Sequence, residues 1–263
     1  MELRTVGILL RDEEQAYPLQ KIGELFERHR IELVQLDSAK TAPDDLDLVM
    51  AMGGDGTALK ALGMCTDCPV LAINFGTVGF LTAGDRSDIE RILGLLLKGD
   101  FLVSERLVLH CQYPTGDIRA VNEVTVRTTT GRLVFTDVYV DDTKIRTIVG
   151  DGVVVGTPTG STGLLLSTGA PIVMPDVRCL VLNGINEYNF SSRSLILPPT
   201  SKIRLHISPE TRDRNVYLTV DGRLIGDLAP EADVLVSQAE TGAKLIYFER
   251  SYFFHNLTSR LSW

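Results

Sequence analysis

The stretch that most constrains the fold lies at residues 46–62, LDLVMAMGGDGTALKAL. It starts as an apolar run at residues 48–52, which is typical of a buried strand in a parallel sheet. Three glycines around Asp55 interrupt the run, and the residues after Thr57 have the composition of a helix. A strand, a glycine turn and a helix start, in this order, place backbone N–H groups where they can face a phosphate. The glycines let the backbone approach a ligand and leave one carboxylate projecting from the turn.

The local spacing fits an ordinary strand-to-helix turn, with Asp55 at its surface, equally well. The segment is neither a P-loop nor a G-x-G-x-x-G fingerprint, because neither spacing is present. A family resemblance favours the functional interpretation. GGDGT is similar to the signature shared by NAD kinases, phosphofructokinases, and the diacylglycerol and sphingosine kinases. These enzymes transfer a phosphoryl group from a nucleotide or polyphosphate to a hydroxyl, so the rest of the chain has to choose among them.

Strand and helix patterns alternate over residues 1–99, which predicts an α/β domain with an open, mainly parallel sheet. Helices are expected at residues 16–30 and 89–98, and strands at residues 4–10, 31–36, 48–52 and 70–74. Ligands bind such sheets beyond the carboxyl ends of the strands. GGDGT and a second glycine turn, after Asn74, both lie at such ends.

The pattern changes near Gly99 to short runs rich in Thr and Val, with polar turns between them. These runs predict a β-rich, sandwich-like domain over residues 100–246. Strands are expected at residues 103–113, 120–128, 133–140, 144–149, 153–155, 179–182, 194–197, 203–207, 216–220 and 233–236.

Composition excludes several classes of function. The chain has 263 residues and a formal net charge of −8, with no basic stripe, which argues against a nucleic-acid binder. No apolar run approaches the length of a membrane span. The first residues pass from a short apolar run into charges, unlike a secretory signal. We therefore expect a cytoplasmic protein that contacts neither nucleic acid nor membrane.

The four cysteines include one close pair. Cys65 and Cys68 have C-x-x-C spacing, which suggests a redox pair or half of a zinc site. A zinc site needs a second pair of ligands, and Cys111 and Cys179 are isolated in the sequence. The pattern therefore favours four reduced thiols in a reducing compartment.

A second glycine-rich segment, DGVVVGTPTGSTGLLLSTGAP, covers residues 151–171. Its Gly, Thr and Ser residues offer hydroxyl and N–H donors without a lysine, which suits a nucleotide sugar or phosphate. Considered alone, the segment fits an ordinary polar loop between strands better.

The resemblance becomes specific at this segment. D-G-x-x-x-x-T-P-T-G-S-T, from Asp151 to Thr162, is similar to a long signature of NAD kinases that the phosphofructokinases and lipid kinases lack. Asn122-Glu123 resembles the N-E pair of that family. Ser192-Arg193, Asp221-Gly222 and residues 257–263 also fit its layout. The resemblance covers residues 6–263, essentially the whole chain.

The resemblance implies transfer of the γ-phosphoryl group of ATP, or of polyphosphate, to the 2′-hydroxyl of the adenosine ribose of NAD, which gives NADP. Asp55 would be the base that orients and deprotonates this hydroxyl. Gly56 would let the ribose approach, and Asn122 and Glu123 would hold the adenosine. The transferred phosphoryl needs Mg²⁺ or a similar cation. We expect that cation to arrive with ATP, because the sequence shows no carboxylate cage.

The resemblance also implies a wider set of residues that bind the nucleotide and NAD. Asp151 and residues 162–167 would line the NAD site partly across a subunit boundary. Lys60 and Arg132 lie where the family uses basic residues, although each fits a solvated charge as well. The full set is Gly53, Gly54, Gly56, Thr57, Lys60, Asn122, Glu123, Arg132, Asp151, Thr159, Ser161, Thr162, Gly163, Leu164, Ser167, Asn186 and Arg223.

The chain departs from the family pattern in the expected substrate pocket. Gly163-Leu164 stands where the family has Ala-Tyr, so the stacking tyrosine is absent, although Tyr188 could supply an aromatic ring. Val149 replaces an arginine, and Arg146 is nearby. Asn186 stands where a small residue contacts NAD, and Arg223 replaces a polar amide. These differences bear on affinity and on the choice between NAD and NADH.

The family is oligomeric, so we expect a dimer or tetramer. The segment 247–263 is expected to pack back on the first domain, because its aromatic residues Tyr252, Phe253, Phe254 and Trp263 favour burial. Two alternatives remain open: a GGDGT-type kinase for another hydroxyl, and a non-catalytic dinucleotide-binding module. TPTGST argues against the first, and Asp55 against the second, because a binder needs no base in that loop.

Overall fold

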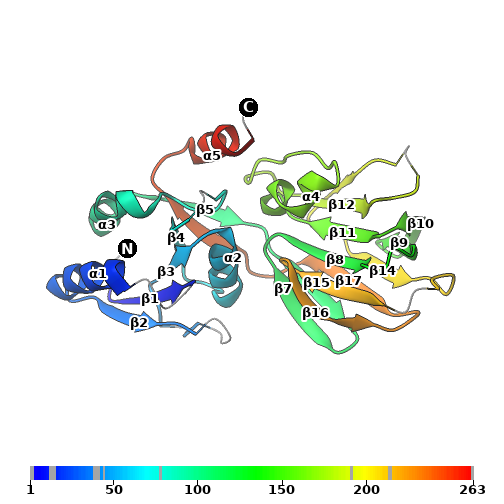
Figure 1. Cartoon of the computed structure of the whole chain (residues 1–263), viewed down its shortest axis with the longest axis horizontal. Helices are drawn as coiled ribbons and strands as arrows, with labels where there is room; N and C mark the ends of the chain where they lie inside the picture. Colours follow the sequence, from blue (N-terminus) through cyan, green and yellow to red (C-terminus); the bar gives the residue numbers. More distant parts are fainter. Residues whose placement is uncertain are drawn as a thin grey trace. The chain divides into compact units, whose positions relative to one another are not determined.

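The structure is a computed structural model that describes residues 3–11, 16–37, 42–43, 45–76, 79–189, 192–212 and 215–261. Trp263, expected in the C-terminal aromatic cluster, lies outside the described residues. The chain forms two compact units, residues 1–105 with 243–263, and residues 106–242. The sequence had suggested boundaries after residues 99 and 246. Both units are drawn in Figure 1.

The first unit is an α/β domain with a six-stranded sheet in the order β2-β1-β3-β4-β18-β5. Neighbouring strands pair in parallel from β2 through to β18, as the alternating pattern predicted. Its elements are β1 (Thr5–Leu10), α1 (Ala16–Arg28), β2 (Glu32–Gln35), β3 (Leu48–Gly53), α2 (Asp55–Met64), β4 (Val70–Asn74), the 3-10 helix η1 (Arg86–Asp88), α3 (Ile89–Lys98), β5 (Leu102–Arg106), β18 (Ala243–Tyr247) and α5 (Tyr252–Leu261).

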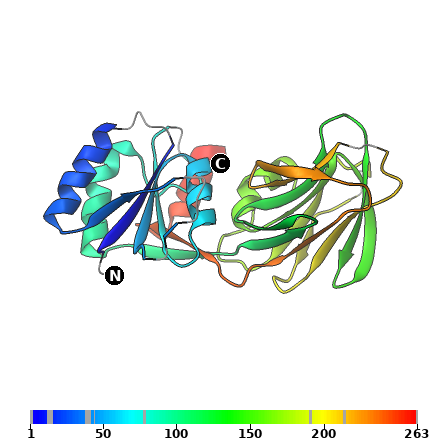
Figure 2. The same cartoon turned by 90° about the horizontal axis from the view of Figure 1, so that it is seen from below.

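Helices cover both faces of this sheet (Figure 2). Every residue of β3 is buried, because the strand lies inside the sheet between β1 and β4. Met50 and Met52 of β3 belong to the core that also contains residues of α1 and α3. The opposite face carries α2, which buries Ala58 and Ala61. Small side chains here let α2 lie close to the sheet, so the start of the helix is held firmly at the end of β3.

The second unit is a sandwich of two antiparallel, six-stranded sheets, β10-β9-β14-β17-β6-β7 and β13-β12-β11-β8-β15-β16. Alternate residues of both sheets fill one apolar core rich in valine. Its elements are β6 (Leu109–Tyr113), β7 (Gly116–Ala120), β8 (Glu123–Thr128), β9 (Val134–Val140), β10 (Thr143–Gly150), β11 (Gly152–Gly156), the 3-10 helix η2 (Thr159–Thr162), α4 (Leu164–Ser167), β12 (Leu180–Ile185), β13 (Leu195–Leu197), β14 (Ile203–Ile207), β15 (Val216–Val220), β16 (Arg223–Leu228) and β17 (Asp233–Gln238). The fold class predicted from the sequence is thus confirmed.

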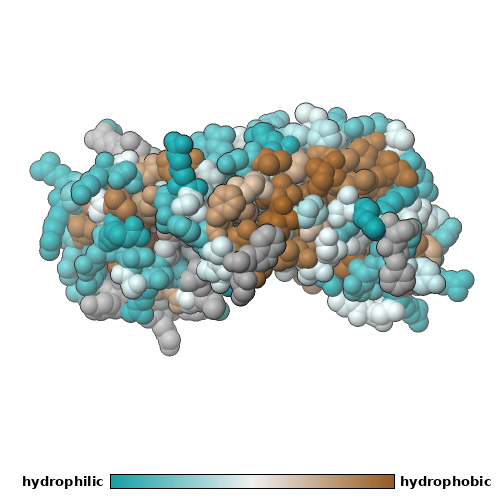
Figure 3. All heavy atoms as spheres, turned by 90° about the horizontal axis from the view of Figure 1, so that it is seen from above, coloured by the Kyte–Doolittle hydropathy of each residue, from teal (hydrophilic) through white to brown (hydrophobic). Residues whose placement is uncertain are grey.

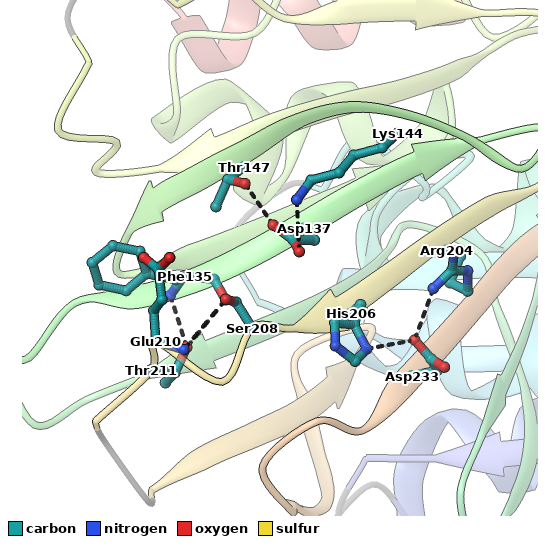
Figure 4. A network of polar contacts seen from close by, with 10 residues as sticks. All are labelled: Phe135, Asp137, Lys144, Thr147, Arg204, His206, Ser208, Glu210, Thr211 and Asp233. Carbon is teal, nitrogen blue, oxygen red and sulfur yellow. Dashed lines mark hydrogen bonds and ion pairs between the residues drawn. The ribbon is translucent and has the colours of Figure 1, made fainter.

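The outward side of the first of these sheets is polar (Figure 4). Asp137 pairs with Lys144 at 2.8 Å and accepts a hydrogen bond from Thr147. Asp233 lies 2.9 Å from His206. The other sheet is covered on its outward side by the segment that follows β11, where Leu165 packs against Val154 in a small second core. This segment contains TPTGST, so the core under it fixes where that loop lies.

Several elements were not expected from the sequence. The predicted strand 103–113 is two strands, β5 and β6. The strands β7 and β16 were not predicted, because most of their residues are exposed or half-buried and show no clear apolar period. The strand β18 and the helix α5 were not predicted either. No helix in the described part of the chain is long and apolar enough to cross a membrane.

Candidate active site

The GGDGT segment forms the junction of β3 and α2. Gly53 is the last residue of β3, Gly54 is the extended N-cap residue, and Asp55 is the first residue of α2. A methyl group on Gly53 would overlap the side chain of the buried Thr57, so this glycine is required by internal packing. Gly54 and Gly56 face open space. These two glycines therefore leave room for a ligand beside the start of the helix.

Two backbone N–H groups hold the carboxylate of Asp55. Phe80 donates to Oδ2 at 2.8 Å, and Leu81 donates to Oδ1 at 3.0 Å. A methyl group on Gly79 would overlap the carboxylate, so Gly79 allows the loop to approach it. Asp55 is half-buried. Each oxygen uses one lone pair on the loop and keeps others for a further partner.

The loop that holds Asp55 is supported from two further segments. At the end of β4, Asn74 pairs with Gly53 of β3, and its side chain hydrogen-bonds Gly76 in both directions. In α5, Asn256 donates to the carbonyl oxygen of Phe80 at 3.1 Å. The C-terminal helix thus helps to position the carboxylate. Asn256 could not be identified from the sequence, because this contact joins residues 176 positions apart.

In the second unit, Asn122 and Glu123 lie at the start of β8. The carboxylate of Asp221, in the turn between β15 and β16, accepts hydrogen bonds from the backbone N–H groups of Val121 at 3.0 Å, Asn122 at 2.7 Å and Glu123 at 3.2 Å. Asp221 has a φ of 48°, which an aspartate tolerates better than most residues. This carboxylate was predicted only as part of the family layout, and it fixes the backbone of the N-E pair.

Glu123 is buried with an unsatisfied oxygen. Its side chain is buried, and neither its Oε2 nor the Oδ1 of Asn122 has a hydrogen-bond partner. Burial, reinforced by the negative charge of Asp221, raises the pKa of Glu123 to about 7. Burial also raises the pKa of Asp221. A buried carboxyl with an open oxygen can take up a proton or accept a hydrogen bond from a ligand.

The TPTGST loop packs against the N-E pair. Thr157 donates its hydroxyl to the carbonyl oxygen of Val121 at 2.6 Å, and its N–H to that of Asn122 at 2.9 Å. A methyl group on Gly160 would overlap the backbone of Asn122. A methyl group on Gly163 would lie 3.5 Å from both the Asn122 amide nitrogen and Glu123 Oε2. Gly163 therefore leaves open the space that these two side chains face.

Most hydroxyls of this loop serve the loop itself. Ser161 is fully buried and donates to the carbonyl oxygen of Pro158 at 2.7 Å, while accepting from the N–H of Val173. Thr159 is buried and accepts from Arg106, and Thr162 donates to the carbonyl oxygen of Thr159. In this structure the hydroxyls of Thr159 and Ser161 therefore shape the loop. The solvent-accessible part of the loop consists of Gly163 and Ser167, which are exposed, and of Thr162 and Leu164, which are half-buried.

Asp151 and Asn186 lie together at the opposite end of β11 from the N-E pair. The Asn186 amide donates to Asp151 Oδ2 at 2.7 Å. Gly156, at one end of β11, pairs with Glu123, and Gly152, at the other end, pairs with Arg127. At about 3.3 Å per residue, Asp151 and Glu123 are separated by the length of the strand. The second unit thus contains two groups of predicted site residues, Asn122 with Glu123 at one end of β11 and Asp151 with Asn186 at the other.

A salt bridge flanks the second group. Arg146 lies 3.2 Å from Glu187 and also hydrogen-bonds Ser192. Arg146 is therefore engaged within the second unit rather than held out toward a ligand. Tyr188, offered above as a replacement aromatic, is 75% exposed beside this group.

Three predicted basic residues are exposed. Lys60 is on α2, Arg132 is in the loop between β8 and β9, and Arg223 begins β16 next to the Asp221 turn. Among the described residues, no three or more His, Cys, Asp and Glu side chains gather where they could hold a metal ion.

Comparison with known proteins identifies the family. The family model of the ATP-NAD kinase N-terminal domain matches residues 10–101, and that of the C-terminal domain matches residues 121–248. The chain belongs to the NAD kinase family. An NAD kinase of Clostridium beijerinckii is 32% identical over 252 residues, which cover 92% of this chain and 88% of that protein. An NAD kinase of Thermococcus gammatolerans is 36% identical over 214 residues, 80% of this chain and 76% of that protein.

Two solved structures share the fold. The yeast NADH kinase in complex with NADH has a TM-score of 0.89 at 23% identity and covers all of this chain and 89% of its own. The NAD kinase from Archaeoglobus fulgidus in complex with ATP has a TM-score of 0.81 at 23% identity, with 98% of both chains covered. The family membership predicted from the motifs is confirmed. The chain is accordingly an NAD kinase, a phosphotransferase that makes NADP, and the comparisons favour neither alternative.

Proposed function

We propose that Asp55 is the general base of this NAD kinase. The observation that carries the proposal is the pair of backbone hydrogen bonds from Phe80 and Leu81, which fix the carboxylate at the start of α2. As the ribose 2′-oxygen attacks the γ-phosphorus, its proton passes to a carboxylate oxygen of Asp55 and ADP leaves. A side chain held by backbone groups needs little reorganisation to do this.

The glycine junction and the start of α2 support the phosphates and the ribose. Open space at Gly54 and Gly56 admits a ligand close to the backbone, and the positive end of the helix favours negative charge there. Mg²⁺ or a similar cation enters as part of the ATP substrate complex and neutralises the charge of the transferred group. The cation thus belongs to the substrate complex, because the described residues offer it no cage of carboxylates.

Asn122 and Glu123 hold the adenosine part of NAD. Asn122 Nδ2 and Glu123 Oε2 both lie 3.5 Å from the position of a methyl group on Gly163, so they border the space that this glycine leaves open. Glu123 Oε2 has no hydrogen-bond partner in the protein, and a hydroxyl or amino group of the ligand would satisfy it. Thr162, Leu164 and Ser167 line the exposed side of the same loop. Leu164 contacts the ligand through apolar packing alone, without the phenol of a tyrosine.

The enzyme acts as a homo-oligomer. Asp151 and Asn186 form a group a strand length away from Glu123, and we assign this group to the dinucleotide bound by a partner copy. Apolar side chains gather on one face of the second unit (Figure 3). The exposed apolar residues of the second unit include Ile145 on the edge strand β10 and Ile196 on the edge strand β13. Exposed apolar residues on sheet edges are typical of surfaces that pair with another chain.

The decisive test is a coupled assay of purified protein. NAD and Mg²⁺ are incubated with ATP or with polyphosphate, and NADP is read with an NADP-specific dehydrogenase. We expect NADP only when NAD and a phosphoryl donor are both present. NADPH formation from NADH, followed in parallel, measures the choice between the two dinucleotides. No NADP with either donor would contradict the assignment. The cytoplasmic location expected from the sequence stays a prediction.

A further inference from the structure

The C-x-x-C pair lies at the opposite end of the helix that begins with Asp55. Cys65 is the C-cap residue of α2, and its backbone N–H donates to the carbonyl oxygen of Ala61. The chain then bends through residues 66–68 before β4. Cys65 is 4% exposed, whereas Cys68 is half-buried. The two thiols thus differ in access: one lies under the turn, and the other reaches its surface.

The two thiols face each other, and a cation lies beside them. The Cys65 thiol hydrogen-bonds the sulfur of Cys68, which is the main reason that the pKa of Cys68 is lowered. Lys244 of β18 donates to the carbonyl oxygen of Asp67 at 3.1 Å, and its positive charge lowers the same pKa further. Burial and the charge of Asp67 act in the opposite direction. The Lys244 ammonium also offsets the negative end of α2, whose last turn carries no basic residue.

A small cavity of about 90 Å³ is lined by both cysteines. It is lined by the turn itself and by Ala42 and Pro43 from the segment before β3. The cavity is large enough for a sulfur atom and a methylene group of a small thiol compound. All four cysteines are reduced in the structure. A reduced pair with one accessible thiol, a hydrogen-bonded second thiol and a neighbouring ammonium is the arrangement that thiol–disulfide exchange requires.

We propose that Cys65 and Cys68 form a redox-active dithiol whose substrate is a low-molecular-weight disulfide such as oxidised glutathione. The Cys68 thiolate attacks one sulfur of the disulfide, forms a mixed disulfide and releases the first small thiolate. Cys65, after losing its proton to solvent or to that thiolate, attacks the Cys68 sulfur and releases the second. The balance is two protein thiols and one small disulfide giving one protein disulfide and two small thiols.

The site is separate from the chemistry proposed for Asp55, although the same helix joins the two. A zinc site is the competing use of the pair. Among the described residues no third His, Cys, Asp or Glu joins the two sulfurs in a metal-holding group. Two thiolates alone leave a zinc ion half-coordinated, so the pair fits exchange better than a structural metal.

The test is a redox titration of the full chain. Reduced protein is equilibrated in buffers of reduced and oxidised glutathione at varied ratio, quenched with acid, alkylated and digested with trypsin. Cys65 and Cys68 fall in one tryptic peptide, residues 61–86, separate from those of Cys111 and Cys179. We expect this peptide to lose two alkylation sites together and two hydrogen atoms in mass, while the Cys111 and Cys179 peptides stay alkylated.

Two serine variants separate exchange from non-specific oxidation. Cys65→Ser lacks the resolving thiol and should accumulate a glutathione adduct on Cys68. Cys68→Ser lacks the accessible thiol, and Cys65 should stay unmodified under the same conditions. Both variants should retain NAD kinase activity when reduced, which shows that they fold. Alkylation of reduced protein should be faster at Cys68 than at Cys65.

Three results would overturn the proposal. The first is two reduced thiols in the most oxidising buffer that leaves the protein folded. The second is a stable glutathione adduct on Cys68 of the wild-type chain, because it would mean that Cys65 cannot resolve the mixed disulfide. The third is one equivalent of tightly bound zinc that protects both thiols from alkylation in the wild-type chain and is lost in either serine variant.

Discussion

Asp55 and Glu123 are both carboxylates at a strand–loop junction, yet the fold treats them in opposite ways. Asp55 is half-buried and accepts hydrogen bonds from two backbone N–H groups, which fix the position of its carboxylate. Glu123 is buried, faces the charge of Asp221 and keeps one oxygen unsatisfied. Its pKa rises to about 7 for that reason. We propose the first carboxylate as the proton acceptor, whereas the second carboxylate lacks a hydrogen-bond partner on one oxygen.

The two carboxylates suit different tasks, one in chemistry and the other in binding. A general base must be ionised and fixed in place before the substrate arrives, and backbone N–H groups are used to hold it. A binding group can be left unsatisfied, because the ligand then gains by satisfying it. If this division is right, isosteric amides at the two positions should have different effects.

Asp55→Asn should have the largest effect. The amide keeps the size of the side chain but cannot accept the ribose proton, so turnover should fall about 10²–10⁴-fold. NAD binding should change little, because the glycine junction and the N-E pair are intact. Initial rates in the coupled assay and NAD titration by calorimetry measure the two quantities. Near-full activity of this variant would mean that Asp55 is not the base.

Gly79→Ala tests the positioning of the same carboxylate. The added methyl group overlaps the Asp55 carboxylate, which must shift away from Phe80 and Leu81. A displacement on the order of 1 Å can cost about 100-fold in turnover, so kcat should fall far more than KM changes. Gly63→Ala, in the same helix α2, is the matched control, since its methyl group meets open space. That variant should keep full activity, and equal losses in both variants would point to damage to α2 instead.

The junction of β3 and α2 could be predicted from the sequence, because the apolar run and the glycine turn that indicate it are adjacent in the chain. Leu48 to Met52 is an unbroken apolar run, and every residue of it is buried in the structure. The strand β18 and the helix α5 gave no such signal. They join the first unit from the far end of the chain, where β18 pairs with β4. The local sequence does not show which strand a short apolar run will pair with across such a separation.

The site divides in the same way. GGDGT identified Asp55 and the open glycines, but not the loop that holds the carboxylate, because Phe80 donates through its backbone, which any residue could supply. The hydroxyls of TPTGST were predicted to be donors to a ligand, yet the Ser161 hydroxyl is buried and donates to the carbonyl oxygen of Pro158 in the same loop. Residue type shows which donors exist, and only the fold shows which are still available.

Glu123→Gln tests the other carboxylate through pH. A folded-state pKa of about 7, above the ordinary 4.5, means that the folded protein holds this proton more tightly than the unfolded chain. The free energy of unfolding should therefore fall as pH rises from about 4.5 to about 7, by about 3 kcal/mol. Glu123→Gln should remove most of this fall, and Asp221, whose pKa is also raised, should account for the remainder.

Urea unfolding at about pH 5 and about pH 8 measures this change for each variant. Glu90→Gln is the control, because its exposed carboxyl has a pKa lowered by the hydrogen bond from Lys21. Because the pKa of Glu90 is lowered, its contribution to the free energy of unfolding rises with pH instead of falling. Glu90→Gln should therefore keep the fall in stability that the wild type shows between these two pH values. An unchanged pH dependence in Glu123→Gln would show that the buried carboxyl is not the group that titrates.

Substitution of Asn186 should have the smallest effect. This residue holds a carboxylate in a third way, through its side chain. Its side chain, rather than a backbone group, donates to Asp151 at 2.7 Å, and its own φ is 46°. Asn186→Ala and Asn186→Gly both remove this donor, but only alanine strains the backbone, by about 1 kcal/mol. Both should raise KM for NAD by a similar factor if Asp151 contacts the dinucleotide, and only Asn186→Ala should lower the unfolding midpoint. Equal midpoints with unequal KM values would mean that the left-handed backbone, and not the carboxylate, serves binding at this end of β11.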